Sequence, residues 1–225
     1  MFGEKLNQEE AYILGFVLAD GGITYANRAF KMRIALNERD LEILEKIKDY
    51  LGKGSICFST DKSGYKEQRR AIYQVYGEPV HGLMSWGIEM CKTGREEMLG
   101  MNKDVYRHFI RGFFDGDGHI TYGYNPKTGR NVHQMGFVGT NELLSSLESH
   151  FRKALDCTPK KIDKNGKSEV SFSLKYCGGK ELVKIYNYFY EGATIYLERK
   201  HDKFKIVHDA LVKGKEGGKY HGKIF

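Results

Sequence analysis

A short segment rich in glycine and aspartate occurs twice in this chain. Residues 15–25 read GFVLADGGITY and residues 112–122 read GFFDGDGHITY, and without a gap they match at seven of eleven positions. In each copy an Asp-Gly pair lies between an apolar run, which favours a helix, and Ile-Thr-Tyr, which favours a strand. The chain is therefore predicted to contain a duplicated unit in which a helix ends on an acid and leads directly into a strand.

The elements predicted around each copy also repeat. Apolar periodicity and turn residues predict the order αββαββα in each half, which gives an α+β protein of two tandem domains. The predicted helices cover 8–20, 39–52, 79–88, 101–117, 141–156, 180–192 and 197–213, and the hairpins cover 23–37, 55–77, 119–139 and 160–177. We place the domains at 1–100 and 101–213 and expect a disordered basic tail at 214–225.

Composition limits the class of protein. The net charge is +7 over 225 residues and the pI is about 9.0, which suits a polyanionic partner such as DNA or RNA. The four cysteines form no C-x-x-C pair and the eight histidines lack metal-site spacing, which argues against disulfide stapling and a zinc ribbon. No apolar run is long enough to span a bilayer, and no signal peptide pattern is present. A soluble, intracellular protein is expected, with its compartment left open.

Small residues recur four positions apart in both motif helices. Gly15 and Ala19 share one face of the first helix, and Gly112 and Gly116 share one face of the second. Glycine within a helix costs about 1 kcal/mol relative to alanine, and close packing of the two helices is a plausible compensation. We therefore expect the two motif helices to pack backbone to backbone.

The aspartates at the predicted helix ends, Asp20 and Asp117, are electrostatically unfavourable, because the helix macrodipole is negative there. A divalent cation removes this penalty, and oxygen ligands with few protein groups suit Mg²⁺. Such acids beside a phosphodiester are typical of metal-assisted hydrolysis. For a single Asp-Gly pair the simpler alternative is a turn or helix cap. A calcium loop is rejected because His119 and Ile120 replace its fifth-position ligand and sixth-position glycine.

The two segments ILGFVLADG (13–21) and IRGFFDGDG (110–118) resemble the paired motifs of a single-chain LAGLIDADG homing endonuclease. The resemblance covers nearly the whole chain and implies a pseudo-twofold pair of αββαββα domains that pack through the motif helices. It implies that the last acid of each motif, Asp20 or Asp117, binds catalytic Mg²⁺, for which Mn²⁺ can substitute. The preceding backbone carbonyls, of Ala19 and Gly116, are candidate metal ligands.

The sixth motif position differs between the copies, with Asp115 in the second and Leu18 in the first, which indicates that the metal does not need it. The family also places a lysine beside each metal site, and the matching candidates are Lys92 and Lys200. Such a lysine could order the attacking water or stabilise charge on the phosphate, and the alternative is a solvated lysine. Asn37 and Thr140 are weaker candidates for a polar residue after the first hairpin of each half.

The resemblance implies that the hairpins form two sheets that lie along the major groove of double-stranded DNA. Side chains at alternate strand positions would then read base edges or meet phosphates. The candidates are Thr24, Arg28, Lys31, Arg33, Lys62, Lys66, Gln68, Arg70, Tyr122, Tyr124, Lys127, Arg130, His133, Gln134, Lys161, Lys164, Lys167 and Lys175. Tyr73, Tyr76, Phe58 and Phe172 are assigned instead to the packed underside of the sheets.

The leading hypothesis is a monomeric, metal-dependent, site-specific DNA endonuclease. By resemblance it would cut both strands of a long, asymmetric target and leave short 3′ overhangs, and its gene would lie in an intron or stand alone. The alternative is a maturase that binds intron RNA, or a DNA-binding regulator that does not cleave. A basic α+β protein without an active site is the third possibility, and it leaves the duplicated motif unexplained.

Overall fold

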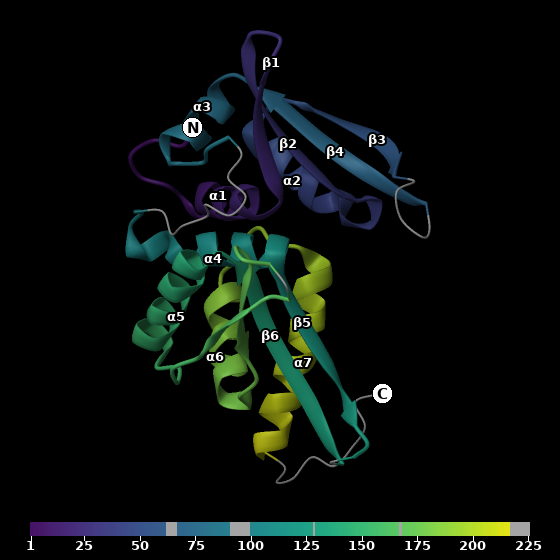
Figure 1. Ribbon diagram of the computed structural model, residues 1–225, viewed down its shortest axis with the longest axis vertical. Coiled ribbons are helices and arrows are strands. Elements are labelled where there is room, and N and C mark those ends of the chain that lie inside the picture. The colour runs from purple at the N-terminus through teal and green to yellow at the C-terminus, as the bar shows by residue number, and fades with distance from the viewer. Residues whose placement is uncertain (62–66, 91–99, 128, 167, 217–225) are drawn as a thin grey trace. The chain divides into compact units, whose positions relative to one another are not determined.

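The computed structural model describes residues 1–61, 67–90, 100–127, 129–166 and 168–216 of the chain (Figure 1). Contacts within the chain divide these residues into two compact units. The first unit contains residues 1–90, 100–116 and 193–197, and the second contains residues 117–192 and 198–216. Each unit is described by itself.

The first unit begins with the first motif helix. Helix α1, Gln8–Asp20, starts at a capping box in which the Asn7 side chain accepts from the amide of Glu10 and the Glu10 side chain accepts from the amide of Asn7. The chain then continues through β1 (Gly21–Ala26), β2 (Ala29–Asn37), the 3-10 turn η1 (Glu38–Asp40), α2 (Leu41–Leu51), β3 (Ser55–Asp61), β4 (Gln68–Tyr76) and α3 (Glu78–Ser85). Helix α4, Lys103–Asp117, belongs to this unit up to Gly116.

The four strands of the first unit form an antiparallel sheet in the order β1-β2-β4-β3. The register pairs Ile23 with Met32, Met32 with Val75 and Ile34 with Tyr73, so these side chains share one face, and all are buried. Helices α1, α2 and α3 contact the strands and complete this core. The other face of the sheet carries mainly polar side chains.

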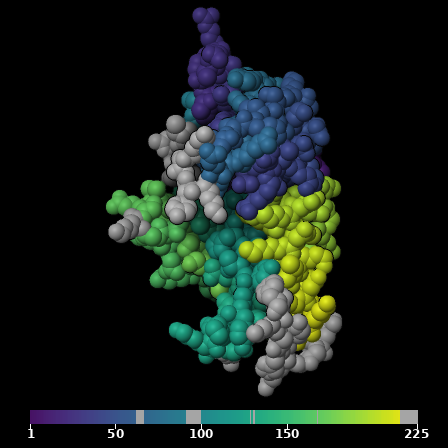
Figure 2. Space-filling view, turned by 90° about the vertical axis from the view of Figure 1, so that its right-hand side faces the viewer, coloured from purple at the N-terminus to yellow at the C-terminus, as the bar shows by residue number. Residues whose placement is uncertain are grey.

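The β1–β2 hairpin closes through a two-residue turn. Asn27 and Arg28 both have positive φ, at 53° and 64°, which matches the twist of the flanking strands. The tip projects from the first unit, where it is the purple end at the top of Figure 2.

Helices α1 and α4 pack backbone to backbone within the first unit. A Cβ atom added at Gly15 would lie 2.0 Å from the carbonyl oxygen of Phe109, and one added at Gly112 would lie 2.0 Å from that of Tyr12. No side chain fits at either position without separating the helices. The close approach predicted from the small-residue spacing is therefore confirmed.

The second unit repeats the strand plan. After Asp117 it contains β5 (Gly118–Asn125), β6 (Arg130–Gly139), α5 (Asn141–Leu155), β7 (Ile162–Lys164), β8 (Phe172–Tyr176), α6 (Gly179–Tyr190) and α7 (Glu198–Glu216). The sheet order β5-β6-β8-β7 corresponds strand for strand to that of the first unit. Its buried face carries Ile120, Met135, Phe137, Leu174 and Tyr176, and α5, α6 and α7 contact the strands. The predicted α+β class with two four-stranded sheets is confirmed.

Helix α7 extends past its predicted end at residue 213. Residues 214–216 continue the helix, so the prediction that disorder begins at residue 214 was wrong for these three. Residues 217–225 lie outside the described part of the chain. The helix is the yellow element on the surface of the second unit in Figure 2. None of the helices in the described residues is long and apolar enough to cross a membrane.

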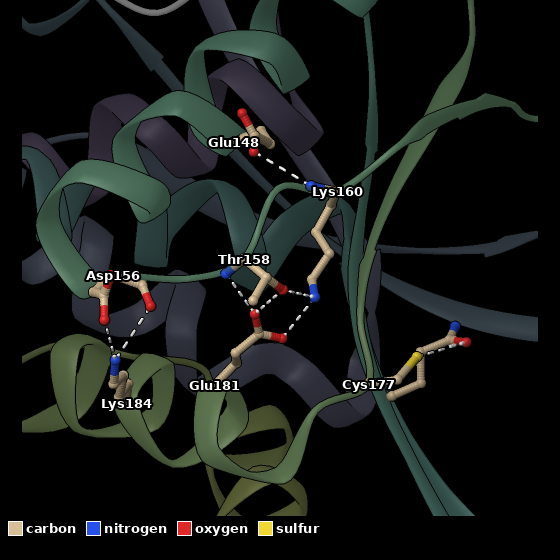
Figure 3. A network of polar contacts seen from close by, with 8 residues as sticks. Glu148, Asp156, Thr158, Lys160, Cys177, Glu181 and Lys184 are labelled. Carbon is tan, nitrogen blue, oxygen red and sulfur yellow. Dashed lines mark hydrogen bonds and ion pairs between the residues drawn. The ribbon is translucent and has the colours of Figure 1, made fainter.

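The connection between α5 and β7 is held by a polar network around Glu181 (Figure 3). The Glu181 carboxylate accepts from the amide and hydroxyl of Thr158, at 2.8 and 2.7 Å, and lies 2.8 Å from the Lys160 ammonium. Burial alone would raise the pKa of Glu181, but the bonds from Lys160 and Thr158 hold it below its usual value. This network stabilises the second unit away from the motif.

Candidate active site and nucleic-acid interface

Both motif helices end on an exposed aspartate. Asp20 is the last residue of α1 and Asp117 the last of α4, and neither helix has a basic residue in its last turn. Each carboxylate therefore lies at the negative end of a helix dipole. The predicted placement of the two acids is observed.

Packing of the last turns brings Asp20 close to α4. A Cβ atom added at Gly116 would lie 2.3 Å from the Cβ of Ala19 and 3.3 Å from Oδ2 of Asp20. The Asp20 carboxylate thus lies beside Gly116, the residue that directly precedes Asp117 in the chain. Only glycine at position 116 leaves room for this arrangement.

The donors in these last turns fit a hard cation. They are carboxylate oxygens and backbone carbonyls, the ligand types that Mg²⁺ prefers, and Asp20 and Asp117 are both exposed. Across the described residues there is no group of three or more His, Cys, Asp or Glu side chains that could hold a metal. A metal bound at either aspartate would need ligands from outside the protein, as Mg²⁺ commonly takes from water and phosphate.

Lys200 contacts the residue that follows the aspartate of the second motif. It is the third residue of α7, its side chain is 7% exposed, and its Nζ donates to the carbonyl oxygen of Gly118 at 2.6 Å. Gly118 follows Asp117, so the ammonium is bound to the backbone next to the acid. This contact argues against a solvated lysine. Lys92, the other predicted lysine, lies outside the described residues.

Asn37 and Thr140 both act as helix caps. Asn37 accepts from the amide of Arg39 at 3.1 Å at the start of η1, and Thr140 accepts from the amide of Leu143 at 3.2 Å at the start of α5. Their position after the first hairpin of each half is thus explained by local structure.

The open face of the first sheet collects several predicted DNA contacts. The register pairs Thr24 with Lys31 and places them with Arg33 on the side opposite the buried core. Arg70 and Gln68 share this side, and Arg70 forms an ion pair of 2.7 Å with Asp61. Arg28 lies in the hairpin turn rather than on a strand.

Two residues on this open face were not predicted as contacts. Gln74 pairs with Arg33 at the middle of the sheet, and its amide nitrogen lies 3.4 Å from the sulfur of Cys57. Tyr76 pairs with Lys31 and is 45% exposed, so its assignment to the packed underside was wrong. Tyr73, by contrast, is fully buried as expected. Pairing β4 with β2 in register would have identified Gln74 from the sequence.

On the second sheet, some of the predicted contact residues lie on the open face and others on the opposite face. Gln134 and Lys175 lie on its open face, together with His119 and Thr121, which were not predicted. Three residues predicted as contacts lie on the opposite face of this sheet: Tyr122, Tyr124 and His133. Tyr122 pairs with His133 and Tyr124 pairs with Asn131, which puts them on the same side as the buried pair Ile120 and Met135. The ammonium of Lys203 in α7 lies 5.8 Å from the centre of the Tyr122 ring, which confirms the side that this tyrosine takes.

His119 and Gln134 form a cluster at the start of β5. The His119 Nε2 lies 3.2 Å from the Gln134 amide nitrogen, and a Cβ atom at Gly136 would lie 2.6 Å from the His119 ring. Burial, with the nearby ammonium groups of Lys175, Lys200 and Lys203, lowers the pKa of His119. A neutral imidazole on a basic face is thus available as a hydrogen-bonding group.

The remaining predicted contacts lie at the edges or outside the described residues. Lys127 is in the β5–β6 turn, Lys161 forms an ion pair of 2.9 Å with Asp163, and Lys164 lies on the same side of the sheet as Leu174 and is exposed. Lys62, Lys66 and Lys167 lie outside the described residues, and the side chain of Arg130 is not described.

The sequence of the chain resembles curated proteins over only part of its length. No family model matches the chain. Two curated relatives match about half of it: a DNA polymerase of Acanthamoeba polyphaga mimivirus, 29% identical over 122 residues, and the DNA-directed RNA polymerase subunit Rpo1C of Methanocaldococcus jannaschii, 28% identical over 120 residues. These matches span 51% and 52% of the chain but only 7% and 13% of the relatives.

Solved structures match nearly the whole chain. The meganuclease I-SmaMI bound to uncleavable DNA superposes with a TM-score of 0.65 at 13% identity and covers 95% of this chain and 92% of that one. The homing endonuclease I-GzeII in complex with its DNA target gives 0.64 at 12% identity, with coverage of 93% and 92%. The meganuclease I-AabMI bound to uncleaved DNA gives 0.60 at 14% identity, also with 93% and 92%. The chain therefore has the fold of the LAGLIDADG homing endonucleases.

Proposed function

We propose that this chain is a site-specific DNA endonuclease that hydrolyses both strands of a long, asymmetric duplex with a divalent metal. The observation that carries the proposal is the pair of motif helices. Each ends on an exposed aspartate with no basic residue in its last turn, and the helices are packed through glycines. The net charge of +7 and the LAGLIDADG fold support DNA as the partner.

In this proposal Asp20 and Asp117 hold Mg²⁺, with Mn²⁺ as a substitute, and the carbonyls of Ala19 and Gly116 are further candidate ligands. The bound metal supplies Lewis acidity and a more acidic water at the scissile phosphate. Lys200 orients water or phosphate oxygen from its position against the Gly118 carbonyl.

The open faces of the two sheets provide the DNA-binding surface. Arg33 and Gln74 on the first sheet, and Gln134 on the second, lie on these faces and carry side-chain groups that can pair with base edges. Lys31 and Lys175 on the same faces suit phosphates. We propose that the protein acts as a monomer, since one chain carries both motif copies. We also propose that it leaves short 3′ overhangs, as the resemblance to the homing endonucleases implies.

The test is cleavage of a duplex library with Mg²⁺, read by sequencing the cut ends. The library includes the DNA that flanks the gene, joined without the gene. Asp20→Asn and Asp117→Asn should each lose double-strand cleavage, by roughly a hundredfold or more, yet bind the same duplex. Asp49→Asn, which changes an exposed aspartate in the last turn of α2, is the matched control and should cut normally.

Either outcome is informative. Discrete cuts with short 3′ overhangs that require metal and both acids would establish the endonuclease. If the wild-type protein binds one sequence but cuts with neither Mg²⁺ nor Mn²⁺, the proposal fails. The alternatives, a maturase for intron RNA or a DNA-binding regulator, would then take its place.

A further inference from the structure

A five-residue segment, 193–197, connects α6 to α7, and we call it the connector. Although α6 and α7 belong to the second unit, the connector groups with the first. Ile195 and Leu197 are buried, at 4% and 5% exposure. The hydroxyl of Thr194 donates to Glu9 in α1, and the Lys46 ammonium of α2 lies 5.6 Å from the centre of the Tyr196 ring. The connector is thus held at several points, and two further bonds to its backbone come from α4.

These two bonds come from buried charged side chains on one face of α4. Arg111 donates from Nε to the carbonyl oxygen of Ile195 at 3.0 Å, and Asp115 accepts at Oδ2 from the amide of Leu197 at 2.7 Å. The two residues are four apart, so they lie one above the other on the helix. Arg111 is 0% and Asp115 1% exposed. Charges buried this deeply are retained only with good hydrogen-bonding partners, and here the connector backbone provides part of them.

Asp115 has a second donor on the same oxygen. The hydroxyl of Tyr12 in α1 donates to Oδ2 at 2.8 Å, and the Arg111 guanidinium lies 5.3 Å from the centre of the Tyr12 ring. A carboxylate at 1% exposure, with one oxygen engaged by two donors, is poorly placed to bind a metal that needs water or phosphate. Asp115 therefore serves a purpose other than that of Asp117, two residues later.

The position of Leu197 determines where α7 begins. Glu198 is the first residue of α7, and Lys200 follows within the first helical turn. Because a helix has a fixed rise and rotation per residue, a shift in where α7 begins would change the direction in which the side chains of its first turn point. The Lys200 ammonium then meets the Gly118 carbonyl at 2.6 Å.

We propose that Asp115 is a positioning residue that fixes Lys200 through the connector and the first turn of α7. The role of Lys200 in DNA cleavage rests on the function proposed above, whereas the positioning itself does not. The proposal explains why the sixth motif position is acidic only in the second copy. In α1 the matching residue is Leu18, which is 3% exposed. The acid is needed only on α4, because it is Asp115 that accepts from the connector backbone at Leu197.

The experiment replaces Asp115 in the full-length chain. Asp115→Asn retains an oxygen that can accept from Leu197, and Asp115→Leu introduces the residue that α1 carries. The first measurement is acylation of Lys200 by an N-hydroxysuccinimide ester, followed by mass spectrometry of the peptides. Asp115→Leu should label Lys200 about tenfold faster than wild type, and Asp115→Asn should stay within about twofold of it.

The second measurement separates positioning from general destabilisation. In single-turnover cleavage Asp115→Leu should slow the reaction about tenfold or more while the Kd for DNA stays within about twofold. In a Lys200→Ala background the same change should add less than about twofold, because the two residues act through one path. Glu181→Gln is the matched control: it weakens a buried carboxylate network in the second unit (Figure 3) and should leave Lys200 labelling unchanged.

Unchanged labelling of Lys200 in a folded Asp115→Leu protein would overturn the proposal, as would fully additive effects with Lys200→Ala. Should Asp115→Leu not fold, a glycine inserted between Leu197 and Glu198 keeps the Asp115 bond and displaces the start of α7. This insertion must then raise Lys200 labelling, and normal labelling would overturn the proposal equally. If the wild type never cuts DNA, only the proposed function fails, because labelling still measures the positioning.

Discussion

Replacing Gly15 by alanine should destabilise the protein, although alanine is the better helix former. The substitution gains about 1 kcal/mol of helix propensity. The new methyl would lie 2.0 Å from the Phe109 carbonyl oxygen and 2.9 Å from the amide nitrogen of Phe113, both backbone atoms that no rotamer change can move. The helices must therefore separate by about 1 Å, which forfeits a quarter to a half of the dispersion energy at each contact along the pair. Overpacking of this kind costs roughly 1–3 kcal/mol, and the upper end applies where backbone must shift.

The expected net loss is about 2 kcal/mol, which lowers Tm by roughly 4–8 °C in a chain of this size. Gly112→Ala should behave alike, because its methyl would lie 2.0 Å from the Tyr12 carbonyl oxygen. Thermal and urea denaturation followed by circular dichroism measure the change. Gly123→Ala is the control, since nothing lies within 4 Å of a Cβ atom there. A Tm at or above that of the wild type for Gly15→Ala would refute the packing argument, since helix propensity alone would then decide the result.

Two further predictions concern pH and DNA binding. Burial, with the Arg111 and Arg107 guanidiniums, lowers the pKa of His108 to about 3. As pH falls below 6.5, His108 is therefore protonated in the unfolded chain but not in the folded one. The free energy of unfolding decreases from that pH down to about pH 3. Between pH 7 and pH 5 the free energy of unfolding of the wild type should fall by about 2 kcal/mol more than that of His108→Asn, as measured by urea titration. An equal pH dependence in the two proteins would contradict this prediction. Gln74→Ala should weaken binding to the natural target about tenfold with an unchanged salt slope, whereas Lys31→Ala should reduce the salt slope by about one, as measured by fluorescence anisotropy.

The parts of the fold that could be predicted are those that depend on local sequence. The duplicated segment predicted two units, and both have the same strand order. The four-residue spacing of Gly15 and Ala19 predicted a close helix contact, because glycine within a helix costs about 1 kcal/mol relative to alanine and close packing compensates for it. Turn residues and periodicity predicted the hairpins, and their ends shift by at most two residues, as for the first hairpin, which begins at Gly21 rather than at residue 23.

What could not be predicted depends on register and on backbone partners. A strand's alternation repeats every two residues, so an error of one position puts Tyr122 and His133 on the wrong face. The role of Asp115 has no sequence signal, because one of its donors is the backbone amide of Leu197, 82 residues away, which any residue except proline supplies. Likewise Lys200 could be matched only by resemblance, since its bond is to a carbonyl of the chain.

The two motif copies also show how one packing contact explains a difference in sequence. At the last turn, α1 carries Ala19 where α4 carries Gly116, and a methyl on Gly116 would lie 2.3 Å from that of Ala19. The contact accepts one methyl group but not two. A chain that evolved by duplication can therefore keep alanine in one copy only if the other has glycine. A methyl at Gly116 would also lie only 3.3 Å from Oδ2 of Asp20, so the same glycine that accommodates Ala19 leaves room for the first acid.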